Sequence, residues 1–568
     1  MKKEQVEVAE SNAPFTRPPF TRPPFTRRQM LGTIGMAGLA AVPDAVAQTA
    51  PKRPRIACLV SYWGLPTSHA DWIVNKLIDG YWWQGAHTPS RVDVVSVYVH
   101  QLDTSLLAQK VCKAKNIPIF KTASEAVTLG GKELAVDGVV IVAEHGNYPT
   151  DLKGHWLLPR WWIYSQVMQV FEQSKRSVPV FNDKHFSYNW DDAKWMFDKS
   201  RELKFPLSGG SSIPFYFRKP ELELAADTPI KNSIVVGGAG DEGAIFHCVD
   251  VLQAFVDRRR GGETGVRSVQ SIRGPEAWNW VERTPWAGKL LEAVRKNFDL
   301  KPRHFQESHF QEGRRPNLCI VDYNDGTKAA VISGTDVGWT WAGEIEGQKD
   351  PTIVSMLGWP GPVSQYHAAN GQEHWITEMM LTGKEPYNAE RLLLSTGIVN
   401  HYMESNWENG RYSAVGRRIE TPFMNMEYHA THGPMFETGP RPPNTPYIRG
   451  FEAQGLATTR LLGSGQQHRE RKIVAGATVD TKWRSGSMPA VIARFVESCM
   501  DYALLGTGPP APSRYRNVTT GEPRRLAISP FSVPNHRIAD NLPGAVRRPD
   551  PRFARYTDMW QIGVAKPT

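Results

Sequence analysis

The sequence predicts an α/β fold whose first domain is built on a doubly wound parallel sheet. From Arg55 onward, short apolar runs alternate with segments in which apolar residues recur at helical spacing. The run Val136–Ala143 is rich in β-branched residues, which is typical of a parallel strand buried on both faces. Strands and helices that alternate at this pace favour a Rossmann-like sheet with helices on both faces.

The elements of this sheet follow one another in short steps. Strands are predicted at residues 56–62, 92–99, 117–120 and 136–143, and helices at residues 71–80, 105–115 and 124–128. In the first helix, Trp72, Leu77 and Ile78 are spaced to form one stripe. That stripe gives the helix an apolar face to pack against the sheet.

The first 47 residues predict an export signal that precedes the fold. The repeat Pro14–Pro18 is copied twice, and its prolines exclude a helix. Arg27 and Arg28 are followed by a weakly apolar, glycine-rich stretch, and Ala45-Val46-Ala47 is a small-x-small cleavage site. This order resembles a twin-arginine signal, which implies the bacterial twin-arginine export machinery as a partner and a periplasmic or secreted location.

The composition is that of a globular protein. Hydrophobic residues make up 40% and charged residues 22%, and there is no run of about 18 apolar residues that predicts a membrane span. The net charge of +10 is spread along the chain, which argues against nucleic acid as a partner. Five widely spaced cysteines predict neither a zinc site nor a disulfide framework. Aromatic faces often stack on sugar rings, but core packing accounts for most of the 19 tryptophans.

Four segments occur in the order of motifs in the Gfo/Idh/MocA family of oxidoreductases, and the chain resembles that family over residues 55–430. The segments are Val136–Val142, Val178–His185 with Asp191–Lys194, Thr382–Tyr387, and Gly410–Tyr428 with Arg418–Pro422. The resemblance implies a Rossmann-like domain at residues 48–205 and an α+β domain with an open, mostly antiparallel sheet at residues 206–430. It also implies a sugar or polyol substrate and leaves a homo-oligomer open.

Two features lie in or after the second domain. The turn Asn324-Asp325-Gly326 predicts a hairpin whose returning strand begins at Lys328. Residues 431–568 are rich in proline and arginine and predict an extension with one helix near residues 489–505, to which we assign no chemistry.

The turn after the first strand departs from the family, which normally has a Gly-x-Gly-x-x-Gly sequence where the backbone approaches a pyrophosphate. Here Gly64 stands alone, next to Tyr62 and Trp63. The missing glycines argue against classical binding of NAD or NADP, so a retained nicotinamide and a cofactor-free site both stay open. The candidate cofactor-binding residues are Gly64, Ser68, Asp103, Glu144, His145 and Asp183.

A formal Gly-x-Gly-x-x-Gly sequence does occur later, at Gly238, Gly240 and Gly243. It follows an apolar strand and precedes a helical stretch, but no acidic residue ends the next strand to bind a ribose. In the family that the chain resembles, this stretch is the loop before the helix that bears the catalytic histidine.

The resemblance implies that Lys184 and His247 are catalytic. Lys184 occupies the position of the family's Glu-Lys-Pro lysine, and His247 matches a histidine that exchanges a proton with a sugar hydroxyl. Asp250 lies on the same helical face and is expected to orient His247. The alternatives are a surface lysine paired with Asp183 and a buried structural histidine. Glu144 and His145 end a strand and could hold a substrate hydroxyl, or a metal if two further ligands joined them; no metal site is predicted.

Three hypotheses about function follow. The chain is an exported oxidoreductase acting on a sugar or polyol, an NAD-dependent enzyme that cleaves glycosides, or a cofactor-free carbohydrate-binding or scaffold protein that kept the fold. The missing glycine turn favours the third hypothesis, whereas the retained lysine and histidine favour an enzyme.

Overall fold

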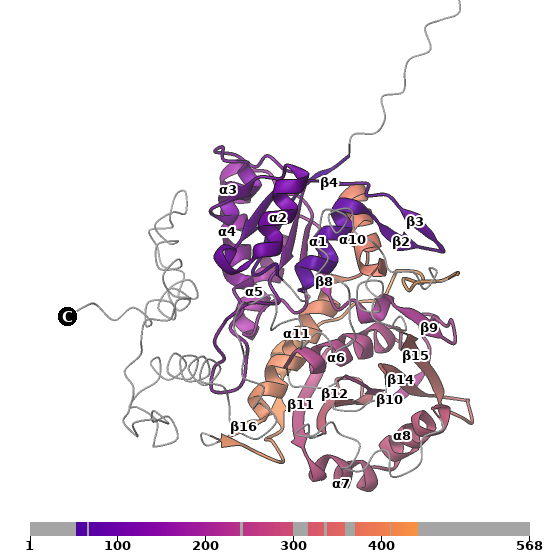
Figure 1. Ribbon diagram of the computed structural model, residues 1–568. Coiled ribbons are helices and arrows are strands. Elements are labelled where there is room, and N and C mark those ends of the chain that lie inside the picture. Colours follow the sequence, from indigo (N-terminus) through magenta and orange to yellow (C-terminus); the bar gives the residue numbers. More distant parts are fainter. Residues whose placement is uncertain are drawn as a thin grey trace, which may run out of the picture. The chain divides into compact units, whose positions relative to one another are not determined.

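A computed structural model describes residues 53–64, 68–238, 242–298, 316–333, 338–357, 370–408 and 411–440 of the 568-residue chain. The chain divides into two units, Met1–Lys52 and Arg53–Thr568, and all described elements belong to the second unit (Figure 1). The export signal, Gly240 and the helix predicted near residues 489–505 lie outside the described residues, so those statements stay predictions.

The first sheet is parallel throughout and has six strands. In spatial order they are β5 (Ile119–Phe120), β4 (Asp93–Val99), β1 (Arg55–Val60), β6 (Gly138–Val142), β7 (Val180–Asp183) and β8 (Leu207–Gly210). Cys58 of β1 lies level with Val97 of β4 and with Val140 of β6. The strand order changes direction between β1 and β6, which confirms the predicted doubly wound sheet.

Both faces of this sheet are buried. The elements around it are α1 (His69–Asp79), the hairpin β2 (Tyr81–Trp83) and β3 (Ala86–Thr88), α2 (Leu106–Lys115), α3 (Ala123–Thr128), α4 (Arg160–Ser174) and α5 (Trp190–Glu202). Leu59 and Ile141 join one hydrophobic cluster, whereas Cys58 and Val140 join another. This alternation follows because successive strand residues point to opposite faces of a sheet.

The second sheet is mostly antiparallel, as predicted, and has eight strands. Their order is β18 (Ile419–Glu420), β11 (Val266–Arg273), β12 (Asn317–Tyr323), β13 (Lys328–Ser333), β10 (Ile230–Val236), β14 (Thr340–Ile345), β15 (Thr352–Leu357) and β9 (Phe217–Lys219). Among the described strands of this sheet, only the pair of β10 with β13 is parallel. The predicted turn at Gly326 joins β12 to β13, and its φ of +90° suits glycine.

Helices also cover both faces of the second sheet. Val235 and Val331 join the larger hydrophobic cluster, together with side chains of α6 (Glu242–Val256) and α11 (Ala389–Ser405). Ile234 and Ile332 join a separate cluster formed with α7 (Pro275–Arg283) and α8 (Pro285–Asn297). The sheet is therefore packed on both sides by helices of the same chain.

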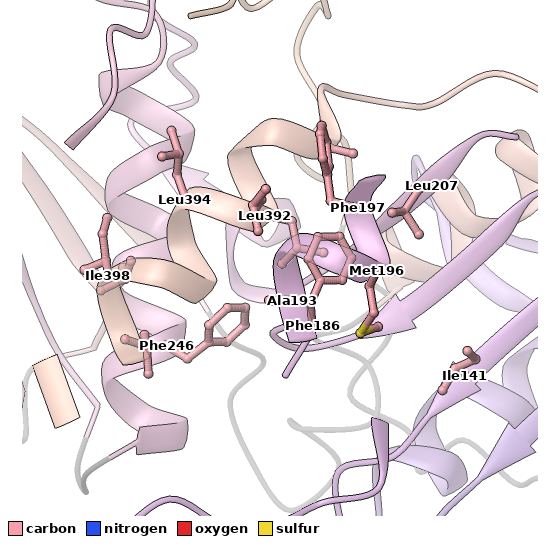
Figure 2. Packing of buried hydrophobic residues seen from close by; sticks show 14 of the residues in the cluster. Ile141, Phe186, Ala193, Met196, Phe197, Leu207, Phe246, Leu392, Leu394 and Ile398 are labelled. Atoms are coloured by element: carbon pink, nitrogen blue, oxygen red, sulfur yellow. The ribbon is translucent and has the colours of Figure 1, made fainter. Parts of the chain in front are cut away.

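The two sheets share one hydrophobic cluster, which includes side chains of α6 and α11. Figure 2 shows part of it, including Ile141 of β6, Phe246 of α6, and Leu392 and Ile398 of α11. Burying each large apolar side chain contributes roughly 1.5–3 kcal/mol. Because α11 packs on α5, α6 and β8, this cluster holds the start of α6 close to the ends of β7 and β8.

Two boundaries differ from those expected. β8 belongs to the first sheet although the second domain was expected to begin at residue 206, and α10 (Asn370–Thr382) packs back on α1. At the other end, Met435 and Phe436 are buried and Glu437 accepts the N–H of Gly371 at 3.0 Å. The packed fold therefore continues into the segment expected to be an extension. Two further short strands are β16 (Trp407–Glu408) and β17 (Arg411–Tyr412).

Candidate active site at Lys184 and His247

Lys184 directly follows β7 and is held in an unusual backbone conformation. Its φ is +65°, in the left-handed region that non-glycine residues seldom adopt, and its N–H donates to Gly210 O at 3.1 Å. The residue is only 4% exposed. Such strain of about 1–3 kcal/mol persists where the surrounding structure enforces it, and it concentrates at functional sites.

The side chain of Lys184 meets His247 from the first turns of α6. Lys184 Nζ lies 2.7 Å from His247 Nε2, and His247 Nδ1 lies 2.5 Å from Ser211 Oγ. Burial lowers the pKa of His247 well below its usual 6.5, and the charge of Lys184 lowers it further, so the ring is neutral. An ammonium can only donate, so Nε2 accepts from Lys184 and the ring proton sits on Nδ1, facing Ser211.

Glu144, at the end of β6, is the counter-charge of Lys184. One carboxylate oxygen lies 3.1 Å from Lys184 Nζ, and the other forms a short contact with Arg160. Burial alone would raise the pKa of Glu144, but the charges of Lys184 and Arg160 outweigh it and hold the pKa well below its usual value. The sequence predicted Glu144 as a cofactor-binding residue, and the structure places it beside Lys184.

Gly243 leaves space next to these two charged groups. Apart from its chain neighbours and the backbone of its own helix, a Cβ at this position would meet two described atoms within 4 Å, Glu144 Oε1 and Lys184 Nζ, each at 3.9 Å. Lys184 has three N–H donors, and Glu144 and His247 account for two of them. A small ligand beside Gly243 could therefore take the third donor.

The sequence led us to expect that Asp250 orients His247. In the structure it does not do so directly. Its carboxylate accepts the N–H of Ser211 at 2.8 Å and lies 3.4 Å from Arg391 Nε. It fixes Ser211, and the Ser211 hydroxyl then contacts His247. Asp250 is therefore a positioning residue that acts one step away, because the helix turns its carboxylate toward β8 and α11 rather than along α6.

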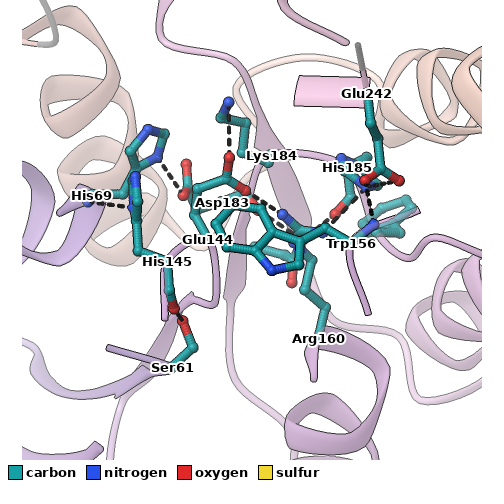
Figure 3. A network of polar contacts seen from close by, with 12 residues as sticks. Ser61, His69, Glu144, His145, Trp156, Arg160, Asp183, Lys184, His185 and Glu242 are labelled. Carbon is teal, nitrogen blue, oxygen red and sulfur yellow. Dashed lines mark hydrogen bonds and ion pairs between the residues drawn. The ribbon is translucent and has the colours of Figure 1, made fainter. Parts of the chain in front are cut away.

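A wider network of buried charges surrounds Glu144 (Figure 3). Arg160 Nη1 lies 3.2 Å from His185 Nε2, and Glu242 Oε1 lies 2.9 Å from His155 Nδ1. Burial opposes protonation of His155, but the hydrogen bond to Glu242 raises its pKa above 6.5. This network connects the start of α4 with the start of α6. Sequence reasoning did not single out Arg160, His155, Glu242 or Ser211.

A second polar group lies at the N-terminus of α1; we call Ser61, Ser68, His69, His145 and Asp183 the α1 seat. Ser68 caps the helix by accepting the N–H of Asp71, and the N–H of His69 donates to His145 Nδ1 at 3.2 Å. His69 Nδ1 lies 2.7 Å from Asp183 Oδ2, so Asp183 pairs with His69 rather than with Lys184. Ser61 Oγ donates to His145 O at 2.6 Å.

The electrostatics of the α1 seat agree with this pairing. Burial and the neighbouring His69 lower the pKa of His145 to about 3, so its ring is neutral and Nδ1 can accept. Free N–H groups at a helix N-terminus are what bind a pyrophosphate in a dinucleotide fold. Here the N–H groups of His69, Asp71 and Trp72 already have acceptors within the chain.

The described residues of the α1 seat do not fit a dinucleotide. The backbone N–H of His69 already donates to His145. The ring of Tyr62 covers Gly64, where an added Cβ would lie 2.1 Å from the phenol oxygen. Asp103, the candidate for ribose binding, is exposed in the short helix Leu102–Thr104 and pairs with no other candidate among the described residues. In the part of the chain that the structure describes, no three His, Cys, Asp or Glu side chains could hold a metal ion.

In the later glycine sequence, the first glycine, Gly238, has a packing explanation, and so does Gly237 just before it. A Cβ at Gly237 would lie 2.7 Å from Trp339 Cα, and one at Gly238 would lie 3.2 Å from Trp339 Nε1. The glycines thus admit Trp339 against the loop before α6, whose Gly240 lies outside the described residues.

No protein-family model and no curated protein matches the chain. Solved structures similar to it include scyllo-inositol dehydrogenase from Lactobacillus casei, at 12% identity over 66% of this chain and 99% of that one, with a TM-score of 0.41. A probable dehydrogenase from Thermotoga maritima has 10% identity over 65% and 99% of the two chains, with a TM-score of 0.40. GenD2 from gentamicin A biosynthesis, solved with NAD, has 11% identity over 65% and 96%, with a TM-score of 0.41. At such values the function has to be argued from this chain's own residues.

Proposed function

We propose that this chain is an enzyme that acts on a sugar or polyol, and that Lys184 and His247 move the proton of one substrate hydroxyl group. The observation that carries the proposal is the 2.7 Å contact between Lys184 Nζ and Nε2 of a neutral His247. A cation that donates and a neutral nitrogen that accepts are the two groups needed to hold and deprotonate an alcohol. The motif around Val178–His185 supports a sugar or polyol as the substrate.

In the proposed step, the substrate hydroxyl enters between the two side chains. Its oxygen accepts a hydrogen bond from Lys184, and its proton passes to Nε2 of His247 as the O–H bond breaks. The imidazolium that forms donates its Nδ1–H to the Ser211 hydroxyl oxygen. Asp250 holds Ser211 in place by accepting its backbone N–H. Lys184 stabilises the negative oxygen that remains, because opposite charges attract strongly where water is excluded.

Proton removal is one half of an alcohol oxidation, and the other half passes the hydride of the same carbon to an acceptor. The oxidoreductase that we favour therefore requires a hydride-accepting co-substrate beside Lys184 and His247. We assign no hydride transfer to NAD or NADP, because the α1 seat does not fit a dinucleotide. The hypothesis of NAD-dependent glycoside cleavage requires the same cofactor and therefore loses the same support.

A carbohydrate-binding protein without catalysis is the second candidate, and the closed α1 seat is the observation that favours it. In that case Lys184 and His247 would serve only as hydrogen-bonding groups, each worth about 0.5–3 kcal/mol. The strained backbone of Lys184 and the charge of Glu144 beside it favour the enzyme.

The test compares Lys184→Met and His247→Asn with the wild type on a panel of sugars and polyols, with and without added NAD, following products by NMR. We expect turnover to fall by about 10²–10⁴-fold while affinity changes by less than about tenfold. His401→Asn, at a buried histidine outside the site, is the control. Sugar binding without any turnover in the wild type would support the binding protein, and dinucleotide released from denatured protein would contradict the closed α1 seat.

We also propose that the chain is exported as a folded protein through the twin-arginine route. Cys58, Cys112, Cys248 and Cys319 are buried free thiols, as expected of a chain that folds in a reducing cytoplasm. No helix within the described residues is long and apolar enough to cross a membrane. Changing Arg27 and Arg28 to lysine should strand the precursor in the cytoplasm, measured by cell fractionation. Efficient export of the double variant would refute this route.

A further inference from the structure

Trp339 lies directly before β14, and its indole lies beside His247. The two ring centroids are 5.9 Å apart with an interplanar angle of 65°, and Tyr216 meets the indole edge-on at 6.4 Å. Trp341, two residues later, is fully buried and stacks on Phe255 at 4.5 Å. Trp339, in contrast, is only partly buried. Trp341 thus fills the core, whereas part of Trp339 remains available next to the proposed base.

The only polar atom of this indole is turned inward. Trp339 Nε1 is buried, near the position that a Cβ of Gly238 would take, and Cys248 Sγ lies 3.7 Å from the same position. Any part of the indole that solvent reaches is therefore ring carbon. Gly237 and Gly238 permit this orientation, because a side chain at either position would crowd the tryptophan.

We propose that Trp339 is the surface on which the ring of a cyclic sugar or cyclitol stacks, so that a ring hydroxyl meets Lys184 and His247. This inference rests on the proposed function and narrows its substrate to ring compounds. The C–H face of a sugar ring is apolar and flat enough to pack on an aromatic face, whereas its hydroxyls point outward to polar groups. An open-chain polyol has no such fixed face and would gain less from Trp339.

The probes are D-glucose and myo-inositol as ring compounds and D-glucitol as the open-chain counterpart, each measured by saturation-transfer NMR. We expect saturation on the ring C–H protons of at least one ring compound, and binding to Trp339→Leu at least about tenfold weaker. Trp280→Leu is the matched control, because Trp280 is also partly buried but packs with α7 and α8 on the other face of the second sheet. That variant should bind as the wild type does.

Three results would overturn the inference: equal binding to Trp339→Leu and wild type, glucitol binding as tightly as the rings, or no ring compound binding the wild type. His247→Asn is measured in the same assay. If it keeps the ring saturation yet its turnover equals that of the wild type, the stacking surface stands and the proposed proton transfer fails. The two proposals therefore fail separately.

Discussion

The α1 seat and the Lys184–His247 site both lie where strands of the first sheet end, and both combine histidine with carboxylate. In the α1 seat, His145 accepts the backbone N–H of His69, and Asp183 pairs with the ring Nδ1 of His69. At Lys184, the described residues account for two donors of the ammonium, and Gly243 leaves space beside the third. One region satisfies its polar groups internally, and the other keeps them available to a ligand.

The difference distinguishes two places at the carboxyl ends of the strands of one sheet. Ligands in such folds bind near the carboxyl ends of strands, at the point where the strand order reverses. Among the described residues at that point, between β1 and β6, Tyr62 lies over Gly64 and His145 accepts the N–H of His69. The side chains of Lys184 and His247 lie further along the same edge, where β7 and β8 meet α6.

The largest expected effect concerns the charges that hold the Lys184–His247 site. Arg160→Met removes the cationic partner of one buried oxygen of Glu144, while Lys184 still pairs with the other, so we expect a loss of up to about 3 kcal/mol in the free energy of unfolding. Arg260→Met removes an exposed pair with Glu346 and should cost at most about 1 kcal/mol. Urea denaturation measures both. Equal losses would mean that the buried network does not hold the site.

A medium effect is expected at the α1 seat. Wild-type protein should bind NAD with a dissociation constant of about 1 mM or weaker. His145→Ala frees the N–H of His69, so we expect NAD and inorganic pyrophosphate to bind about tenfold more tightly by calorimetry. Micromolar binding of NAD to the wild type would show that the α1 seat is open after all.

A third effect is expected on the slope of stability against pH. The pKa of His145 is about 3 in the folded chain and near 6.5 when unfolded, so below pH 6.5 the unfolded state binds more protons. His145 therefore stabilises the fold above pH 6.5, and this contribution is lost as the pH falls toward 3, by at most about 1.4 kcal/mol per pH unit.

His145→Asn should flatten that slope in urea titrations between pH 6.5 and 4, and a change at the exposed His429 should not. His185 and His247 also have lowered pKa values, so they too make the fold less stable as the pH falls. The pKa of His155 is raised, so His155 has the opposite effect on stability. An unchanged slope in His145→Asn would argue against its burial as a neutral acceptor.

Much of the fold could be predicted from local sequence patterns. The first sheet was predictable because its strands are short apolar runs with helical stripes between them, and the hairpin at Gly326 because its turn residues are specific. α4 was missed because its 15 residues, Arg160–Ser174, are buried on nearly all sides and show no single apolar stripe. β8 was missed because Leu207–Gly210 is short and half glycine.

The candidate site was predictable only where a motif marked it. Lys184 and His247 were found through their family-like surroundings, and the structure brings them together. Glu144, Arg160 and Ser211 come from β6, α4 and the end of β8, so their approach depends on long-range packing that no local spacing records. Asp250 was placed by helical spacing alone, which gives the face of a helix but not the partner of a carboxylate.

The pair α7 and α8 has a consequence for assembly. These two helices, with Trp278, Trp280 and Trp286, lie over an apolar face that includes Ile234 and Ile332. A sheet face of this kind would otherwise be an adhesive surface for a second copy of the chain. The two helices cover this apolar face, so we expect that removing residues 275–297 would expose it and promote self-association of the chain.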